Sequence, residues 1–255
     1  MKKISLKLSK ENKTIIAIII IVAIIFGFND NKESFTFLAW VVNFIFVLFI
    51  SAISFLVTLL GYYLASKYFH STTSVAISQL ERLGIQESAE IARVGFRNLR
   101  LKRTPLRKIP LGIIIAVLVT LISNGKIFFT AFYSLKTESK RIGYRFKYTS
   151  NLEEGLIAFT GLISLFILLF IFNIINLEKG AQVTTWLIIW QLLPLANLPG
   201  GKMLMGSRTL WILAVSFSLF ALLLIPVLHV ALTIFLSVLF ALAVTILYFK
   251  QVEYK

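Results

Sequence analysis

The sequence predicts an all-α polytopic membrane protein with about six transmembrane helices and one re-entrant hairpin, and three observations lead to this fold class. The mean hydropathy is +0.88. Only 15% of the 255 residues are charged, so no soluble fold could bury this much apolar surface. The third observation is a series of apolar runs near the length of a membrane span, at residues 14–28, 36–66, 111–135, 155–177, 183–198 and 210–249.

The first and last runs define the two ends of the chain. The first follows the basic segment MKKISLKLSKENK and has no small-residue cleavage site after it, so residues 1–35 are interpreted as a cytoplasmic tail with a retained signal anchor. The last run is about twice as long as one span needs to be, and it contains Pro226. Residues 211–255 are therefore expected to form a two-helix hairpin.

Loop charges predict the orientation of the chain in a cytoplasmic membrane. Residues 66–110 carry nine Lys or Arg against three Glu, and residues 136–154 carry five against three. The positive-inside rule places both segments, and both termini, in the cytoplasm. The run 111–135 must then enter and leave the bilayer from one face. Its SNGK turn leaves two arms too short to span, which predicts a re-entrant hairpin that is helical or partly β.

The composition also bounds the partners and the chemistry. The formal net charge of +15 lies in the loops between apolar runs, so we expect a lipid bilayer and no nucleic acid as partner. The chain has no cysteine, which excludes disulfides and thiolate metal sites. No Asp or Glu lies inside an apolar run, which disfavours a transporter coupled to protons or cations.

One stretch within the apolar sequence breaks the rules for a transmembrane helix. Residues 192–204 read LLPLANLPGGKML and include two prolines, an asparagine and two glycines, directly after the apolar run TTWLIIW. Non-helical backbone at membrane depth is tolerated only where it is buried in protein or lines a cavity. This segment is therefore expected to mark the functional centre.

The same stretch resembles a known family. QLLPLANLPGGK, residues 191–202, is similar to the third metal-ligand segment of the site-2 proteases, which are intramembrane zinc metalloproteases; their pattern is approximately Asn-Leu-Leu-Pro-x-x-x-Leu-Asp-Gly-x-Lys. The continuation MLMGSRTLWIL resembles the archaeal branch, where Arg-x-x-Trp opens the next span. GLIAFTGLISLFILLF is similar to the family's Ala-Gly-Pro-Leu-x-Asn helix, with Gly161 in place and Leu162 at the proline. The resemblance implies a site-2-protease-like membrane core over residues 36–210, with a cytoplasmic basic loop at 67–110.

The departures from the family pattern concern its chemistry. VTLLGYYLASKYF occupies the slot of the His-Glu-x-x-His helix, which places Tyr62 at the first His, Tyr63 at the Glu and Ser66 at the second His. Pro199 stands at the Asp. In the family the two His and the Asp bind zinc and the Glu is the general base on zinc-bound water. We therefore expect no metal, no cofactor and no catalytic residue here, although the family would imply zinc.

These observations predict a catalytically inactive site-2 protease homologue, a pseudoprotease. Such a scaffold could bind or hold a membrane helix or an extended peptide of a partner, by strand addition to exposed backbone groups. The candidate peptide-binding residues are Gln191, Pro194, Asn197 and Gly200.

Four alternatives stay open from sequence. The prolines could merely kink a helix in a structural subunit of a membrane complex, the chain could be transporter-like, or it could be an active intramembrane peptidase if the metal site is misaligned. A hydrolase with Ser66 as nucleophile is the fourth, because His70 lies at i+4 and shares its helix face.

Overall fold

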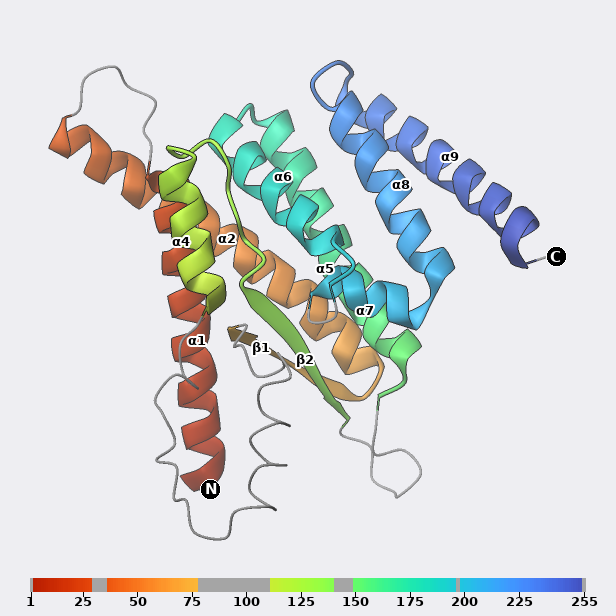
Figure 1. The fold of residues 1–255 in the computed structure, drawn as a ribbon, viewed down its shortest axis with the longest axis horizontal. Coiled ribbons are helices and arrows are strands. Elements are labelled where there is room, and N and C mark those ends of the chain that lie inside the picture. The colour runs from red at the N-terminus through yellow and green to blue at the C-terminus, as the bar shows by residue number, and fades with distance from the viewer. Residues whose placement is uncertain (1, 29–35, 78–110, 140–148, 196–197, 254–255) are drawn as a thin grey trace, which may run out of the picture.

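The structure, a computed structural model, describes residues 2–28, 36–77, 111–139, 149–195 and 198–253. Most of it is helical, and a two-stranded antiparallel sheet lies beside the helices (Figure 1). In chain order the elements are α1 (Lys2–Gly27), α2 (Phe37–Tyr68), β1 (Ser71–Ile77), α4 (Leu111–Ile122), β2 (Tyr133–Ser139), α5 (Asn151–Ile174), α6 (Glu178–Leu192), α7 (Pro199–Gly206), α8 (Arg208–Leu224), α9 (Val230–Tyr248) and the short π-helix η3 (Phe249–Glu253).

Three of the described helices are long and apolar enough to cross a membrane: α2, α5, and α9 with the residues that continue it to Val252. The shorter apolar helices span Asn12–Gly27, Gly112–Ile122 and Arg208–Leu224. A helix of 17 residues reaches only about 26 Å at 1.5 Å per residue, less than the roughly 30 Å of hydrocarbon. The fold class is thus a helical membrane protein, but the prediction of about six spanning helices is wrong for the described chain, because an apolar run need not be helical over its whole length.

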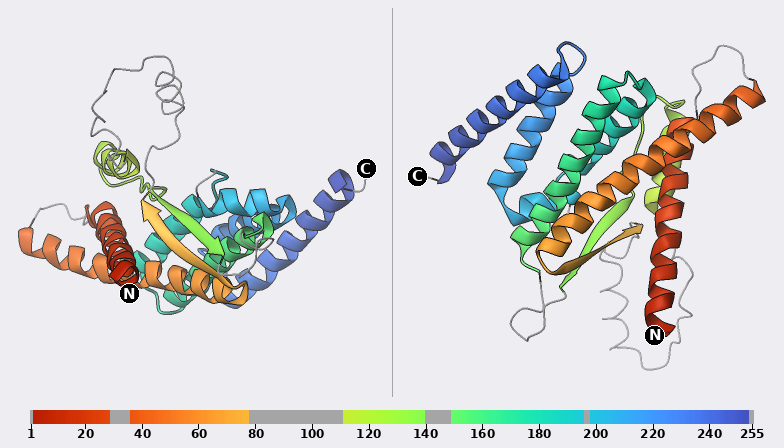
Figure 2. Two further views of the ribbon diagram at one scale, coloured as in Figure 1. Left: turned by 90° about the horizontal axis from the view of Figure 1, so that it is seen from below. Right: turned by 180° about the vertical axis from the view of Figure 1, so that it is seen from behind.

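α2 and α5 form the centre of the helical layer and pack against each other over much of their length (Figure 2). α5 begins at a capping box, in which the Ser150 hydroxyl accepts a bond from the Glu153 N–H and the Glu153 carboxylate accepts one from the Ser150 N–H. The buried face of α2 carries Ser51, Ser54 and Thr58, which are almost fully enclosed. Small hydroxyl side chains at such an interface let helix backbones approach closely.

α8 and α9 form a hairpin that packs mainly on itself, and α8 also contacts α5, α6 and α7 (Figure 1). Pro226, where the sequence predicts a division into two helices, lies in the turn between them. The most apolar window of α9 is 17% buried, whereas that of α5 is 61% buried. Of the three helices that are long and apolar enough to span, α9 therefore buries the smallest share of its surface within the protein.

The sheet differs from the predicted re-entrant hairpin. The first arm of that hairpin is the helix α4, and the second arm leads into β2, whose partner is β1 and not the first arm. The register runs from Ser71 opposite Ser139 to Ile77 opposite Tyr133. β1 lies within the segment predicted as the cytoplasmic basic loop 67–110, and residues 78–110 lie outside the described chain.

The connection from α4 to β2 is held by aromatic contacts. The ring of Phe128 stacks on Phe26 of α1 with 4.5 Å between centroids, and its carbonyl accepts a hydrogen bond from the indole of Trp190 on α6. Phe129 meets the same indole edge-on at 4.5 Å. These contacts fix the point at which β2 begins, between α1 and α6.

Candidate functional site

A chain of buried hydrogen bonds links α2, α6 and β2. The Tyr62 hydroxyl donates to Oε1 of Gln191 at 3.3 Å, and Nε2 of Gln191 donates to the Tyr133 hydroxyl at 2.7 Å. All three side chains are at most 2% exposed. Burying polar groups that bond to one another costs much less free energy than burying them unpaired. The hydrogen bonds therefore favour one arrangement of the three elements. We call these three residues the Tyr–Gln–Tyr bridge.

The ring of Tyr62 lies directly on the backbone of α5. A Cβ atom built on Gly161 would overlap this ring, at 2.5 Å from Cδ1. Directly before Tyr62 on α2, a Cβ on Gly61 would lie 2.5 Å from the Ser164 hydroxyl and 3.0 Å from the Thr160 carbonyl. Glycine at these two positions lets the helices come close enough for Tyr62 to reach across α5 towards α6.

The Tyr133 end of the bridge is also packed by apolar groups. The Phe55 ring meets the Tyr133 ring edge-on at 5.4 Å. Burial raises the pKa of Tyr133 well above its ordinary value, and the hydrogen bond from Gln191 lowers it by less. The phenol is therefore protonated at neutral pH and acts as a neutral hydrogen-bonding group.

The helix break after Gln191 is closed by its own chain. Pro199 begins α7, and a Cβ on Gly200 would lie 2.5 Å from the Leu192 and Leu193 carbonyl oxygens. The Leu192 carbonyl, which the break frees from helical bonding, accepts a hydrogen bond from the indole of Trp211 at 3.1 Å. The carbonyl group freed at the end of α6 is therefore satisfied by a side chain of α8.

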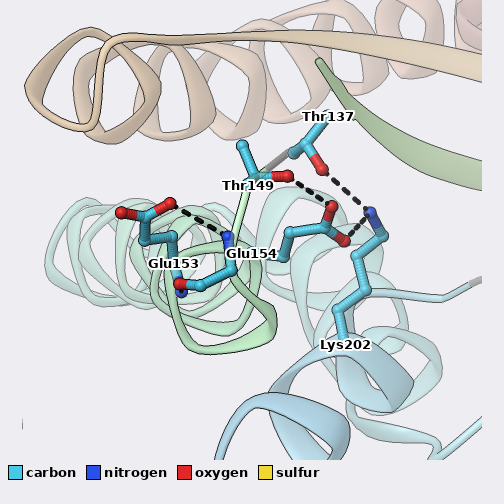
Figure 3. Close-up of polar contacts among 6 residues, drawn as sticks. Thr137, Thr149, Glu153, Glu154 and Lys202 are labelled. Atoms are coloured by element: carbon cyan, nitrogen blue, oxygen red, sulfur yellow. Dashed lines mark hydrogen bonds and ion pairs between the residues drawn. The ribbon is translucent and has the colours of Figure 1, made fainter. Parts of the chain in front are cut away.

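A polar cluster joins α5, α7 and the far end of β2 (Figure 3). Nζ of Lys202 lies 2.8 Å from Oε2 of Glu154 and donates to the Thr137 hydroxyl at 3.4 Å. The Thr149 hydroxyl donates to the other carboxylate oxygen of Glu154 at 2.8 Å. We call Thr137, Glu154 and Lys202 the Lys202 cluster.

Comparisons of the chain with protein-family models, with curated proteins and with solved structures give no match. The function is therefore argued from the site alone.

The structure brings together only some of the residues that the sequence singles out. Tyr62 and Gln191 meet in the bridge, whereas Tyr63 is 58% exposed on another face of α2. Pro199 and Gly200 are buried in the break, and Pro194 is exposed. Asn197 lies outside the described residues.

The Ser66 and His70 pairing has no hydrogen bond in the structure. The Ser66 hydroxyl donates to the Tyr63 carbonyl at 2.9 Å, and the Ser66 carbonyl accepts from the Ser71 hydroxyl. His70 is exposed at the end of α2, with φ at +50°. The serine is thus engaged with backbone and not with a base, which gives no support to the hydrolase alternative.

The residues at the zinc positions of the resemblance do not fit that metal. Tyr62 offers a phenol bound to an amide, Ser66 a hydroxyl bound to a carbonyl, and Pro199 a ring without a donor atom. None of them is an imidazole or a carboxylate, the ligands that zinc takes in catalytic sites. Within the described ranges no three His, Cys, Asp or Glu side chains gather.

Sequence reasoning missed Tyr133, Glu154 and Thr137. Tyr133 follows the apolar run GKIFFTAF without any motif, and its partner in the bridge is 58 residues away. Lys202 is part of the family pattern, but its two partners belong to other elements. Only a three-dimensional arrangement brings these residues together.

We expect Gln191→Leu to destabilise the protein by about 2 kcal/mol, because it leaves two buried phenol hydroxyls without their partner. Denaturant unfolding of the purified protein in detergent measures the change. Adding Tyr62→Phe and Tyr133→Phe to Gln191→Leu should restore most of the loss, since an entirely apolar bridge leaves nothing unpaired. If the triple variant is weaker than Gln191→Leu, the bridge is not a closed hydrogen-bonded unit.

Proposed function

We propose that the chain is a non-catalytic, site-2-protease-like membrane protein that binds a membrane segment of a partner as an extended strand along the outer edge of β2. The observation that carries this proposal is that, within the described part of the chain, residues 133–137 of β2 pair with β1 alone and attach to the helices from one face.

The outer edge of β2 has backbone groups available for another strand. Within the described chain, no backbone hydrogen bond connects residues 133–137 to an element other than β1. α1 and α2 pack against β1, while β2 packs extensively only against β1 among the described elements. An unpaired strand edge is a template for strand addition, and beside a bilayer its unpaired groups are costly.

The proposal of a non-catalytic scaffold rests on the side chains that stand where the resembled family has its metal ligands. Tyr62, Gly161 and Gln191, each taken from a different segment of the resemblance, lie in one contact group. Where an imidazole would be needed there is a phenol that donates to an amide. This arrangement supports retention of a binding scaffold without the groups for metal-assisted hydrolysis.

The proposed orientation keeps the chain multi-pass in the cytoplasmic membrane with both termini in the cytoplasm. Both termini on one side require an even number of crossings, and three helices meet the length requirement. The proposal therefore requires one shorter apolar helix to cross as well, and Asn12–Gly27 suits this role because a crossing there returns the chain to the cytoplasm at the end of α2, where the basic segment 66–110 begins. A short helix crosses by thinning the bilayer locally, at modest cost.

The absence of cysteine allows a direct test by disulfide crosslinking. Lys136→Cys puts one thiol on an exposed position of β2, and Leu239→Cys puts one on the exposed face of α9 as a control. Each variant is reconstituted in phosphatidylcholine–phosphatidylglycerol vesicles with one of two synthetic peptides. One peptide is an uninterrupted leucine-rich helix, and the other has a central Asn-Pro-Gly break. Each peptide is made as a series in which a single cysteine occupies successive positions.

We expect the broken peptide to crosslink to Lys136→Cys at every second position, as a paired strand does, and not to Leu239→Cys. A repeat of three to four residues, or equal yields at the two sites, contradicts strand addition. Zinc near one atom per chain by elemental analysis, lost in the Tyr62→Ala, Ser66→Ala variant, would contradict the non-catalytic part and favour an active peptidase.

A further inference from the structure

We infer that Lys202 is a positioning residue for β2: it holds the outer half of the strand in the place where a partner strand would add. The inference rests on the proposed function only in saying what the position of β2 is used for. The defined position of β2 itself can be measured without any partner.

β2 is attached to the helices by three side chains on the same face. Tyr133 bonds to Gln191 at one end, Leu135 is buried in the middle, and Thr137 bonds to Lys202 at the other end. Tyr133 and Thr137 are four residues apart, so the two polar attachments are about 13 Å apart along a strand. Without the Lys202 bond, the outer half of β2 would lose one of its side-chain attachments to the helices.

The ion pair of the Lys202 cluster is not the only contact that joins α5 to α7. A Cβ on Gly206 would lie 2.6 Å from the Asn151 carbonyl and 3.2 Å from Cα of Gly155. A Cβ on Gly155 would lie 3.1 Å from the Lys202 carbonyl. The two helix backbones are therefore in direct contact beneath Lys202, and the side chain of Lys202 adds the ion pair with Glu154 and the bond to the strand.

Lysine has the chemistry for this double contact. Its ammonium group has three donors, of which one meets Glu154 and another meets Thr137. The Lys202 side chain is only 12% exposed, and the carboxylate opposite it is itself oriented by Thr149. An ammonium group that is bonded and enclosed in this way does not move out into solvent. The position of Nζ is therefore defined, and with it the position of Thr137 (Figure 3).

The test measures distances between spin labels in the otherwise cysteine-free protein. Labels at Lys136→Cys and Met205→Cys report on β2 relative to α7, and labels at Leu152→Cys and Met205→Cys report on α5 relative to α7; all three positions are exposed. Each pair is combined with Lys202→Met, Lys202→Arg or Thr137→Val. Lys126→Met, which removes an exposed charge from the turn after α4, is the matched control.

We expect Lys202→Met and Thr137→Val to at least double the width of the β2–α7 distance distribution, while the α5–α7 distribution stays unchanged. Lys202→Arg and Lys126→Met should leave both distributions narrow, because arginine retains the donors. Thr137→Val leaves the ion pair in place, so it tests the inference even if Lys202→Met fails to fold.

Two results separate this inference from the proposed function. A narrow β2–α7 distribution in Thr137→Val overturns the positioning role and leaves the crosslinking result in the parent protein untouched. An unchanged β2–α7 distance distribution together with a widened α5–α7 distribution also overturns the positioning role, since Lys202 would then only join the two helices. A widened β2 distribution, together with a parent that never crosslinks the broken peptide, supports the positioning role and contradicts the proposed function.

Discussion

Gly161→Ala will destabilise the protein by about 3 kcal/mol, because the added methyl group overlaps the buried ring of Tyr62. The ring is 1% exposed and its hydroxyl is bonded to Gln191, so it has no space to move into without breaking the bridge. Moving α5 away instead would open the α2–α5 interface at the centre of the helical layer. Denaturant unfolding in detergent measures the loss.

A double-mutant cycle identifies the cause of that loss. In a Tyr62→Ala background the overlap is absent, and Gly161→Ala should cost much less than in the parent. Gly27→Ala is the control, because its Cβ would first meet the Phe44 side chain at 3.1 Å, and alanine is the better helix former. Equal costs of Gly161→Ala in the two backgrounds would show that the ring of Tyr62 is not what the methyl group meets.

Gly200→Ala will have an effect of similar size, also about 3 kcal/mol, for a different reason. Here the new Cβ would lie 2.5 Å from the carbonyl carbon and oxygen of Leu192, which are backbone atoms that cannot rotate away. α7 must then shift relative to the end of α6, and the hydrogen bond from Trp211 to the Leu192 carbonyl is lost with it.

The measurement for Gly200→Ala is again unfolding in detergent, with Gly27→Ala as the reference. Hydrogen exchange adds a local readout: amides at the start of α7 should exchange faster, while those in the middle of α5 should not. An unfolding curve identical to that of the parent would mean that the break opens without cost, and would remove the argument that α6 and α7 are held in one arrangement.

The long helices are the part of the fold that the sequence predicts well. The apolar runs 36–66 and 155–177 correspond to α2 and α5 within a few residues, because a long, strongly apolar segment has no other fold at membrane depth. The run 111–135 has a similar length, but it forms a 12-residue helix followed by a turn and an extended segment. Hydropathy alone does not reveal where such a run leaves the helix.

The pairing of the two strands could not be predicted, because each strand depends on a partner far away in the sequence. The β1 sequence STTSVAI carries β-branched residues, which favour a strand. A single short strand, however, forms a stable sheet only when a second strand pairs with it. The candidate site shows the same limit. Tyr62 and Gln191 were accessible through the family pattern, whereas Tyr133 and Glu154 become partners of the site only through β2 and α5.

The order of the two strands in the chain also affects how the protein is made. β1 ends at Ile77 and β2 begins at Tyr133, so the whole of residues 78–132 must be synthesised before the strands can pair. At roughly 5–20 residues per second, β1 waits several seconds without its partner. During that time it is an open strand edge beside a newly inserted α2, and the membrane-insertion machinery or the lipid surface has to shield it from pairing with another nascent chain.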